Sequence, residues 1–163
     1  MEPSAPRVAT RVVETLSDEG STLALAESCT GGLAASMVTD VPGASAIFDR
    51  GFVTYSNQAK VEELGVKVDV IEDDGAVAAA VAEAMAEGAR GAADADWAAA
   101  TTGILGPTGG SEAKPEGTVY VGVAGPGGTS VQRYGFDGER REVKEQSARQ
   151  MLVDLLEMVR AER

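Results

Sequence analysis

Apolar residues recur at intervals of three and four along several segments of the chain, and this spacing places them on one face of an α-helix. In the first such segment Val8, Val12 and Leu16 share a face. The polar run 17–20 follows and ends in glycine, which marks the end of that helix. We therefore predict helices over residues 6–16, 33–39, 58–64, 75–91 and 139–160.

Shorter apolar runs lie between these segments and have the composition and flanking turns of buried strands. Gly51 interrupts one of them and predicts a β-bulge there. Gly125 to Gly128 separates the last two and predicts a hairpin. The stretch 66–71 fits neither the helical nor the strand pattern clearly. The predicted strands cover residues 22–26, 47–55, 97–102, 118–124 and 130–136.

The order of these elements predicts the fold class. Helices alternate with strands along most of the chain, and a hairpin and a long helix follow. That order is typical of an α/β protein, and we expect a three-layer α/β/α sandwich with a mixed sheet. We expect residues 1–163 to form a single domain, because a chain of this length buries roughly 70% of its unfolded surface. Alanine is abundant and aromatic residues make up 4%, which favours close helix packing.

The net charge of the chain is −12, from 26 acidic and 14 basic residues. Such a surface repels phosphate backbones, so we expect no nucleic-acid partner. Only four of the basic residues are lysines. Two explanations of this acidic, lysine-poor composition stay open: ordinary solubility, and adaptation to a high-salt cytoplasm. Thermal stability that is greatest at low KCl would count against the second.

Cysteine and histidine usage limits the chemistry. Cys29 is the single cysteine and there is no histidine, so we expect neither a disulfide within the chain nor a zinc or multi-cysteine site. No apolar run approaches the roughly 18 residues of a membrane span. The first residues, 1–7, lack the basic start and apolar stretch of a signal peptide. We therefore expect a cytoplasmic protein with no membrane contact.

The segment from Glu27 to Gly32 follows a predicted strand and precedes a predicted helix. Ser28 then lies at a strand-to-helix turn, where backbone N–H groups face whatever docks there. This geometry fits either a phosphate site or a serine nucleophile with an oxyanion site. The alternative is purely structural: the glycines permit a tight turn and Ser28 caps the helix.

Without histidine, a serine nucleophile needs another base, and Lys60 is the candidate. If Asn57 is the N-cap, Lys60 is the third helical residue, where the helix dipole disfavours a cation and lowers the pKa of its amine. Partial burial beside other groups would lower this pKa further. A neutral amine could accept the proton of Ser28. The alternative is a solvated surface lysine. Tyr55 could relay a proton or orient the serine, or it could be a half-buried packing residue.

Cys29 competes with Ser28 as the nucleophile. A cysteine at a helix N-terminus is expected to have a lowered pKa. We favour the serine, because cysteine enzymes generally pair the thiol with histidine. Retained activity in Cys29→Ala and lost activity in Ser28→Ala would decide between them.

A second glycine-rich loop, 103–117, also follows a predicted strand. Lys114 is followed by Pro115 and no helix begins there, so the loop is not a P-loop. A loop of this length usually serves a site, and we expect it to enclose a substrate. Thr102, Gly106 and Lys114 are the residues that we expect to contact a phosphate or ribose.

Three segments together resemble the CinA C-terminal domain family, the nicotinamide-nucleotide amidohydrolases. Residues 26–32 carry the first motif, 48–57 with Lys60 the second, and 103–119 the third. The likeness spans nearly the whole chain, and the order of the segments makes it specific. Leu105 and the segment 111–113 depart from the usual pattern, which bears on substrate fit more than on chemistry.

The resemblance implies hydrolysis of the carboxamide of nicotinamide mononucleotide to nicotinic acid mononucleotide and ammonia, in pyridine nucleotide salvage. It assigns catalysis to Ser28, Tyr55 and Lys60 and implies no metal or organic cofactor. Under it, the substrate-binding residues are Thr30, Gly31, Gly32, Arg50, Asn57, Thr102, Gly106 and Lys114.

Two further functions and the assembly state complete the expectations. The runner-up is a noncatalytic nucleotide-binding or competence-associated module of the same fold. A phosphoryl-transfer enzyme is a weaker third option, because the chain has no Walker signature and no arranged metal-carboxylate cluster. An alanine-rich helix face or the hairpin edge could form a dimer, and we expect a homo-oligomer.

Overall fold

Five strands form one mixed sheet in the order β2-β1-β3-β4-β5. The structure, a computed structural model, describes residues 3–163. β1 lies between β2 and β3 and is parallel to both, whereas β4 pairs antiparallel with β3 and with β5. The strands are β1 (Leu23–Glu27), β2 (Phe48–Val53), β3 (Trp97–Gly103), β4 (Thr118–Gly125) and β5 (Gly128–Gly135).

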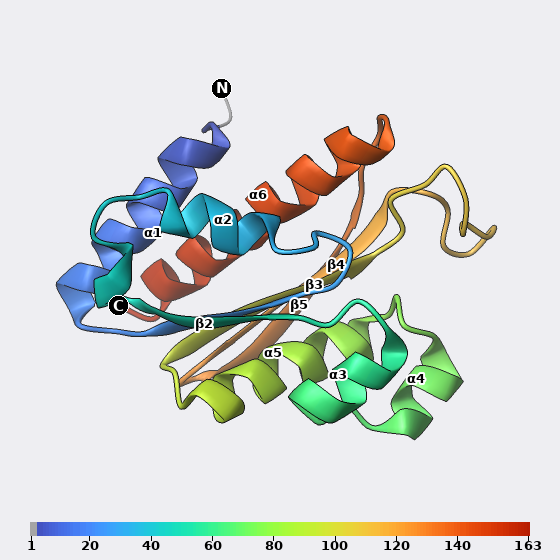
Figure 1. Cartoon of the computed structure of the whole chain (residues 1–163), viewed down its shortest axis with the longest axis horizontal. Coiled ribbons are helices and arrows are strands. Elements are labelled where there is room, and N and C mark those ends of the chain that lie inside the picture. Colours follow the sequence, from blue (N-terminus) through green and yellow to red (C-terminus); the bar gives the residue numbers. More distant parts are fainter. Residues whose placement is uncertain (1–2) are drawn as a thin grey trace.

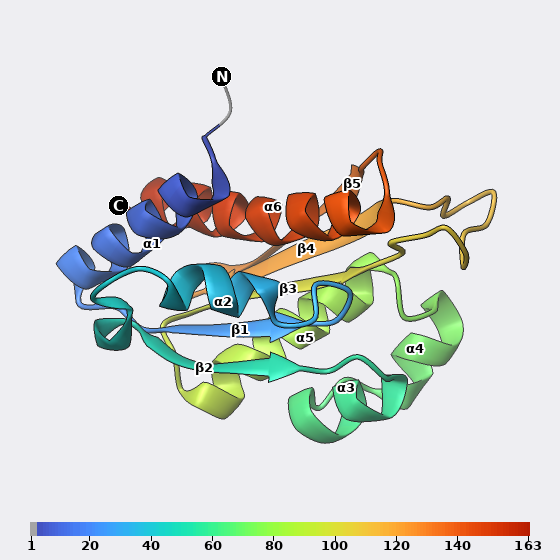
Figure 2. The same cartoon turned by 45° about the horizontal axis from the view of Figure 1, so that its top comes forward.

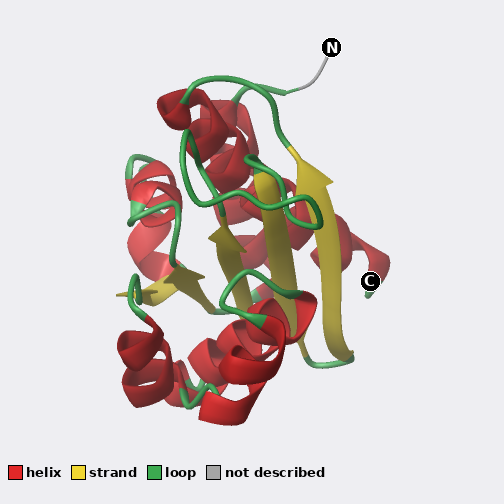
Figure 3. Cartoon of the chain, turned by 90° about the vertical axis from the view of Figure 1, so that its right-hand side faces the viewer, coloured by secondary structure: helices red, strands yellow, loops and turns green. Residues whose placement is uncertain are grey.

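Helices cover both faces of the sheet (Figures 1 and 2). Viewed from the right-hand side of Figure 1, the strands pass between an upper and a lower group of helices (Figure 3). This arrangement confirms the predicted three-layer sandwich. One layer contains α1 (Ala5–Glu19), α2 (Leu33–Thr39) and α6 (Arg140–Ala161), and the other contains α3 (Asn57–Leu64), α4 (Val68–Asp74) and α5 (Ala79–Ala93). A short 3₁₀ turn, Ala44–Ala46, precedes β2.

The two faces of the sheet carry different side chains, because successive strand residues point in opposite directions. Leu23 and Leu25 of β1 join the core under α1, α2 and α6. Ala24 and Ala26 join the core under α5. Small side chains on that second face let α5 approach the sheet closely, and a Cβ at Gly122 of β4 would lie 2.7 Å from the Ala82 carbonyl oxygen of α5.

The structure settles the stretch that the sequence left open, because residues 68–71 belong to α4. Elsewhere the local structure differs from the prediction. Gly75, with φ 78°, follows α4, and α5 begins only at Ala79. The β2 bulge falls at Asp49 and not at Gly51, because Leu23 pairs with Phe48 and Ala24 with Arg50.

The N-cap of α3 is Ser56 and not Asn57. The Ser56 hydroxyl accepts the N–H of Ala59 at 3.0 Å. Both residue types are good caps, so the sequence alone did not separate two adjacent candidates. Lys60 is therefore the fourth helical residue of α3.

Within residues 3–163, none of the helices is both long and apolar enough to cross a membrane.

Gly88 and Gly91 of α5 offer a matched test of this packing. A Cβ at Gly88 would lie 2.0 Å from the carbonyl oxygen of Leu64, the last residue of α3, whereas a Cβ at Gly91 would meet nothing within 4 Å. We predict that Gly88→Ala destabilises the protein by about 1–3 kcal/mol through overpacking. Gly91→Ala should stabilise it by about 0.5–1 kcal/mol, because alanine favours the helix. Urea denaturation measures both, and equal effects would contradict the close approach.

Candidate active site

Three parallel strands bring the predicted motifs to one edge of the sheet. The carboxyl ends of β1, β2 and β3 lead into the turn at Ser28, into Tyr55 and into the second glycine loop. A cavity of about 260 Å³ lies at this edge. It is lined by Ser28, Cys29, Tyr55, Lys60, Ala76, Val77, Thr102, Gly103, Ile104, Leu105, Gly106, Thr108, Gly109 and Arg140.

Ser28 and Lys60 are hydrogen-bonded, with 2.9 Å between Oγ and Nζ. The backbone of Ser28 is bound to the neighbouring strand, because its N–H donates to the Thr101 carbonyl of β3 at 3.2 Å. Lys60 reaches it from the first turn of α3. Both side chains are buried, and Lys60 is only 1% exposed. Lys60 is therefore not a solvated surface lysine.

The other partners of the Lys60 amine are two backbone carbonyls. Nζ donates to the carbonyl oxygen of Thr54 at 2.9 Å and to that of Tyr55 at 3.2 Å. A carbonyl oxygen can only accept, so these two contacts use two N–H groups of the amine. The third position faces Ser28. It holds an N–H when the amine is charged and a lone pair when it is neutral, and in the neutral state it can accept the serine proton.

Burial lowers the pKa of Lys60 below its usual 10.5. Desolvation is the main cause, because the charged amine loses water and gains only neutral acceptors. The sequence argument predicted a lowered pKa but gave first place to the helix dipole. The direction is confirmed, and the main cause is burial.

Cys29 does not behave as predicted. Its side chain is 5% exposed, and desolvation raises the pKa of the thiol from 9.0 to about 12. The expectation of a lowered pKa at a helix N-terminus is wrong, because α2 begins only at Leu33 and burial outweighs the favourable interactions. A buried neutral thiol is a poor nucleophile.

The start of α2 is also used differently from the prediction. The N–H groups of Ala34 and Ala35 donate to the two carboxylate oxygens of Glu27, at 2.8 and 3.0 Å. These first-turn donors therefore do not face a bound phosphate or oxyanion. The N–H of Gly31 donates to Ser28 O, and that of Leu33 to Thr30 O.

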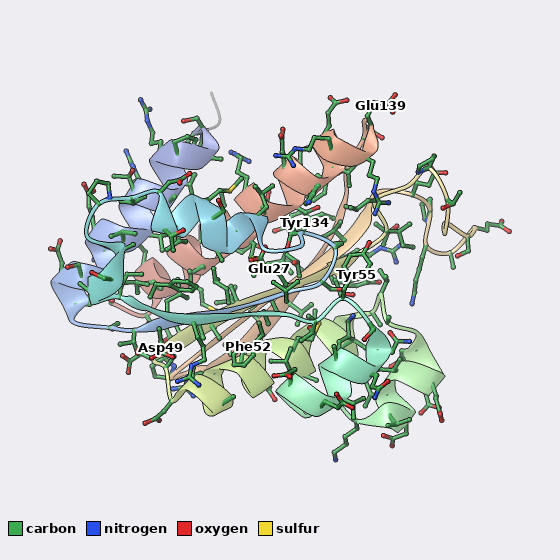
Figure 4. All side chains as sticks on the ribbon, in the orientation of Figure 1. Glu27, Asp49, Phe52, Tyr55, Tyr134 and Glu139 are labelled. Atoms are coloured by element: carbon green, nitrogen blue, oxygen red, sulfur yellow. The ribbon has the colours of Figure 1, made fainter. Side chains whose placement is uncertain are left out.

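Tyr55 lies at the mouth of the cavity, beyond the end of β2 (Figure 4). Its side chain is 61% exposed. The hydroxyl accepts a hydrogen bond from Nη2 of Arg140 at 3.1 Å, and Nη1 of Arg140 donates to Gly106 O at 2.9 Å. Arg140 thus joins Tyr55 to the second glycine loop across the cavity.

Two of the predicted substrate-binding residues line the cavity, Thr102 and Gly106. The hydroxyl of Thr102 donates to Ala76 O at 2.8 Å, which holds one wall in place. Leu105, which departs from the usual pattern of the family, also lines the cavity. The departing segment 111–113 does not.

Six other predicted residues lie outside the cavity, and their role in binding stays a prediction. Thr30 is buried, with its hydroxyl 2.9 Å from that of Thr101. Lys114 donates from Nζ to Asp74 O at 2.6 Å. Gly31 and Gly32 belong to the turn but do not line the cavity, nor does exposed Asn57 at the start of α3.

Arg50 completes this group. It forms an ion pair with Asp49, which Figure 4 places far along β2 from Tyr55. The resemblance alone had suggested Arg50, and β2 carries it away from the sheet edge where the cavity lies.

Sequence reasoning missed two residues with contacts in and around the site, Glu27 and Arg140. Arg140 is in the first turn of α6, where a cation is disfavoured by the helix dipole. The same argument had been applied to Lys60, so this signal was present in the sequence. Glu27 stands next to Ser28, and an acidic residue before a helix start was the available signal. Across residues 3–163 no cluster of His, Cys, Asp or Glu could hold a metal ion.

The fold and this site define an α/β protein with a buried serine–lysine pair at the carboxyl edge of a mixed sheet. A family model described as CinA C-terminal domain matches residues 5–159. The chain belongs to this family.

Curated relatives support the assignment. A CinA-like protein of Geobacter sulfurreducens is 53% identical over 135 residues, which is 83% of this chain and 33% of that protein. One of Syntrophotalea carbinolica is 50% identical over 86% of this chain and 34% of that protein. The chain thus spans about a third of the length of these relatives.

Solved structures share the whole fold. The competence/damage inducible protein CihA of Agrobacterium tumefaciens has a TM-score of 0.90 and 37% identity, covering 97% of this chain and 99% of that one. A CinA superfamily protein of Klebsiella pneumoniae has a TM-score of 0.93 and 33% identity, covering 98% and 99%. The five-stranded mixed sheet with its two helical layers is therefore the fold of this superfamily.

We predict that Cys29 resists alkylation in the folded protein. A pKa of about 12 leaves roughly one thiol in 10⁴ ionised at pH 8. Iodoacetamide should label the native protein at least about 100-fold more slowly than the urea-unfolded protein at the same pH. Mass spectrometry reads the single cysteine directly, and equal labelling rates would contradict the raised pKa.

Proposed function

We propose that the protein hydrolyses the carboxamide of nicotinamide mononucleotide to nicotinic acid mononucleotide and ammonia. The observation that carries this proposal is the 2.9 Å contact between the Ser28 hydroxyl and the buried amine of Lys60. Neutral acceptors and a lowered pKa suit this amine to accept a proton. Membership of the CinA C-terminal domain family supports the substrate class.

In the proposed reaction Ser28 Oγ attacks the carboxamide carbon while Lys60 Nζ takes the hydroxyl proton. The C–O bond forms and the carbonyl electrons move to oxygen, which gives a tetrahedral intermediate. Collapse of this intermediate breaks the C–N bond, and the proton held by Lys60 passes, with the help of Tyr55, to the departing nitrogen, which leaves as ammonia and returns Lys60 to its neutral form. Water then attacks the acyl ester, again with Lys60 as base, and releases the carboxylic acid and Ser28.

The oxyanion needs hydrogen-bond donors within the turn that holds Ser28. Gly31 and Leu33 already use their N–H groups inside that turn, and Ala34 and Ala35 donate to Glu27. The donors would therefore come from the other N–H groups of the turn, those of Cys29, Thr30 and Gly32.

Arg140 and Tyr55 support binding and proton transfer at the mouth of the cavity. Arg140 carries a permanent positive charge, which suits an anionic nucleotide. Tyr55 is the tyrosine among the residues that line the cavity, and we assign its hydroxyl assistance in protonating the leaving ammonia. When the substrate binds the guanidinium of Arg140, the hydrogen bond between Arg140 and the Tyr55 hydroxyl can rearrange.

The first test is ammonia release from nicotinamide mononucleotide, measured at low and high KCl with three variants. Ser28→Ala should lower kcat by at least about 10³-fold through loss of the nucleophile. Lys60→Met should lower it about 10²–10⁴-fold through loss of the base. Ser36→Ala, an exposed serine of α2, is the matched control and should retain full activity.

Absence of ammonia release by the wild type at every salt concentration would overturn the proposal. Binding of the nucleotide without turnover would then favour the noncatalytic module. Activity that persists in Ser28→Ala would overturn the role of the serine, whatever the substrate.

The pH profile tests Lys60 separately. Only the neutral amine can act as base, so kcat/KM should rise with pH and level off at a pH below 10.5, because the pKa of Lys60 is lowered. Stopped assays across pH 6–10.5 would measure this limb. A wild-type profile that is flat over this range would contradict the assignment of the base.

A further inference from the structure

We infer that Glu27 is a positioning residue that holds the Ser28 turn in its reactive geometry by binding the start of α2. This inference rests on the proposed function, since it assigns a role within the same site. Glu27 is not among the residues that line the cavity, and the hydrogen bonds of the Lys60 amine go to Ser28, Thr54 and Tyr55. Its effect on the reaction is therefore transmitted through the turn that carries Ser28.

The main chain of Glu27 is fixed by the sheet. As the last residue of β1, it pairs with Val53 of β2 on one side and with Thr101 of β3 on the other. Its carbonyl oxygen accepts the N–H of Thr54 at 2.8 Å. The residue before the nucleophile is thus held between two neighbouring strands.

The side chain of Glu27 connects this fixed point to α2. Its carboxylate accepts two N–H groups, of Ala34 and Ala35, and the residue is 1% exposed. The N-cap of α2 is Gly32, which has no side chain to satisfy these donors. Figure 4 shows Glu27 between the end of β1 and the α2 layer. The carboxylate therefore replaces the missing cap.

The turn between these two attachment points contains glycines, which allow many backbone conformations. Gly31 and Gly32 have φ of 59° and 101°. Joining the strand end to the helix start restricts this turn, and the 2.9 Å contact between the Thr30 and Thr101 hydroxyls holds its middle. Under these restraints the Ser28 hydroxyl faces Lys60.

A carboxylate is needed because both of its oxygens accept. In Glu27→Gln one oxygen becomes an NH₂ group, which would face a backbone N–H and repel it. The shape of the side chain is otherwise preserved. Glu83→Gln is the matched control, because it replaces the same carboxylate by the same amide at an exposed position of α5.

The experiment compares the kinetics of both variants with the wild type. Glu27→Gln should lower kcat about 10²-fold, because a nucleophile displaced by about 1 Å loses its alignment. Its KM should change by less than about twofold, because no cavity residue is altered. The rising limb of the pH profile should keep its position, since Lys60 is untouched. Glu83→Gln should match the wild type in every measurement.

Three outcomes of this kinetic comparison would overturn the inference. The first is unchanged kcat in folded Glu27→Gln. The second is a loss of activity that only mirrors the unfolded fraction seen by circular dichroism. The third is a shifted pH limb, which would show that the Glu27 charge acts on Lys60 directly.

Labelling of Ser28 by phenylmethylsulfonyl fluoride separates this inference from the proposed function. Ser28 Oγ forms a bond to sulfur, fluoride leaves, and the serine proton passes to Lys60. Mass spectrometry should show slower labelling of Ser28 in Glu27→Gln than in the wild type, also when nicotinamide mononucleotide gives no ammonia. Equal labelling rates would overturn the positioning role whatever the outcome of the ammonia assay.

Hydrogen exchange in the wild type covers the case in which Glu27→Gln does not fold. First-turn N–H groups have no acceptor within their helix, so they exchange quickly unless another group binds them. The N–H groups of Ala34 and Ala35 should be protected by Glu27. Exchange of both at the rate of an unstructured peptide would overturn the inference.

Discussion

The burial of an amine whose hydrogen-bond partners are a hydroxyl and two carbonyl oxygens is the constraint on which the site depends. Two backbone carbonyls, of Thr54 and Tyr55, accept from Lys60 and leave one direction of the amine for Ser28. Those carbonyls follow β2, and the serine follows β1, so the contact exists only because the two strands are parallel neighbours. Desolvation lowers the pKa of this amine, and the cost of burying a lysine is offset by hydrogen bonds to neutral oxygens. In the function that we propose, this amine is the base that a chain without histidine needs.

The glycine-rich turn beside Ser28 shows how the same local sequence can serve different ends. A strand, a turn and a helix start suggest an anion site made of backbone N–H groups. In this protein the Glu27 carboxylate takes up two of those donors. These first-turn donors of α2 are thereby bound within the protein, so the anionic part of the substrate that we propose would bind elsewhere. Arg140, which lines the cavity, is suited to that role.

Much of the fold could be predicted, because the strongest patterns belonged to long elements with one buried face. Local rules predicted that α1 ends near Gly20 and that a hairpin turns around Pro126. The structure confirms both. The errors fell where two neighbouring residues could serve equally well, as Ser56 and Asn57 did at the cap of α3, or where burial reversed a local expectation, as it did for the pKa of Cys29. Neither kind of information is present in a short window of sequence.

The sequence by itself determined the alternation of helices and strands, the absence of histidine and the residues that could act as nucleophile and base. It also carried the family resemblance, because that depends on motifs and their order. Only the tertiary structure decided which residues meet. It brought Ser28 to Lys60 and placed Arg140, which follows Ser28 by 112 positions in the chain, in the lining of the same cavity. It left Arg50 and Lys114 outside that cavity. The physical reason is that burial and hydrogen bonding between distant segments depend on strand order and layer packing, and local propensities do not encode either.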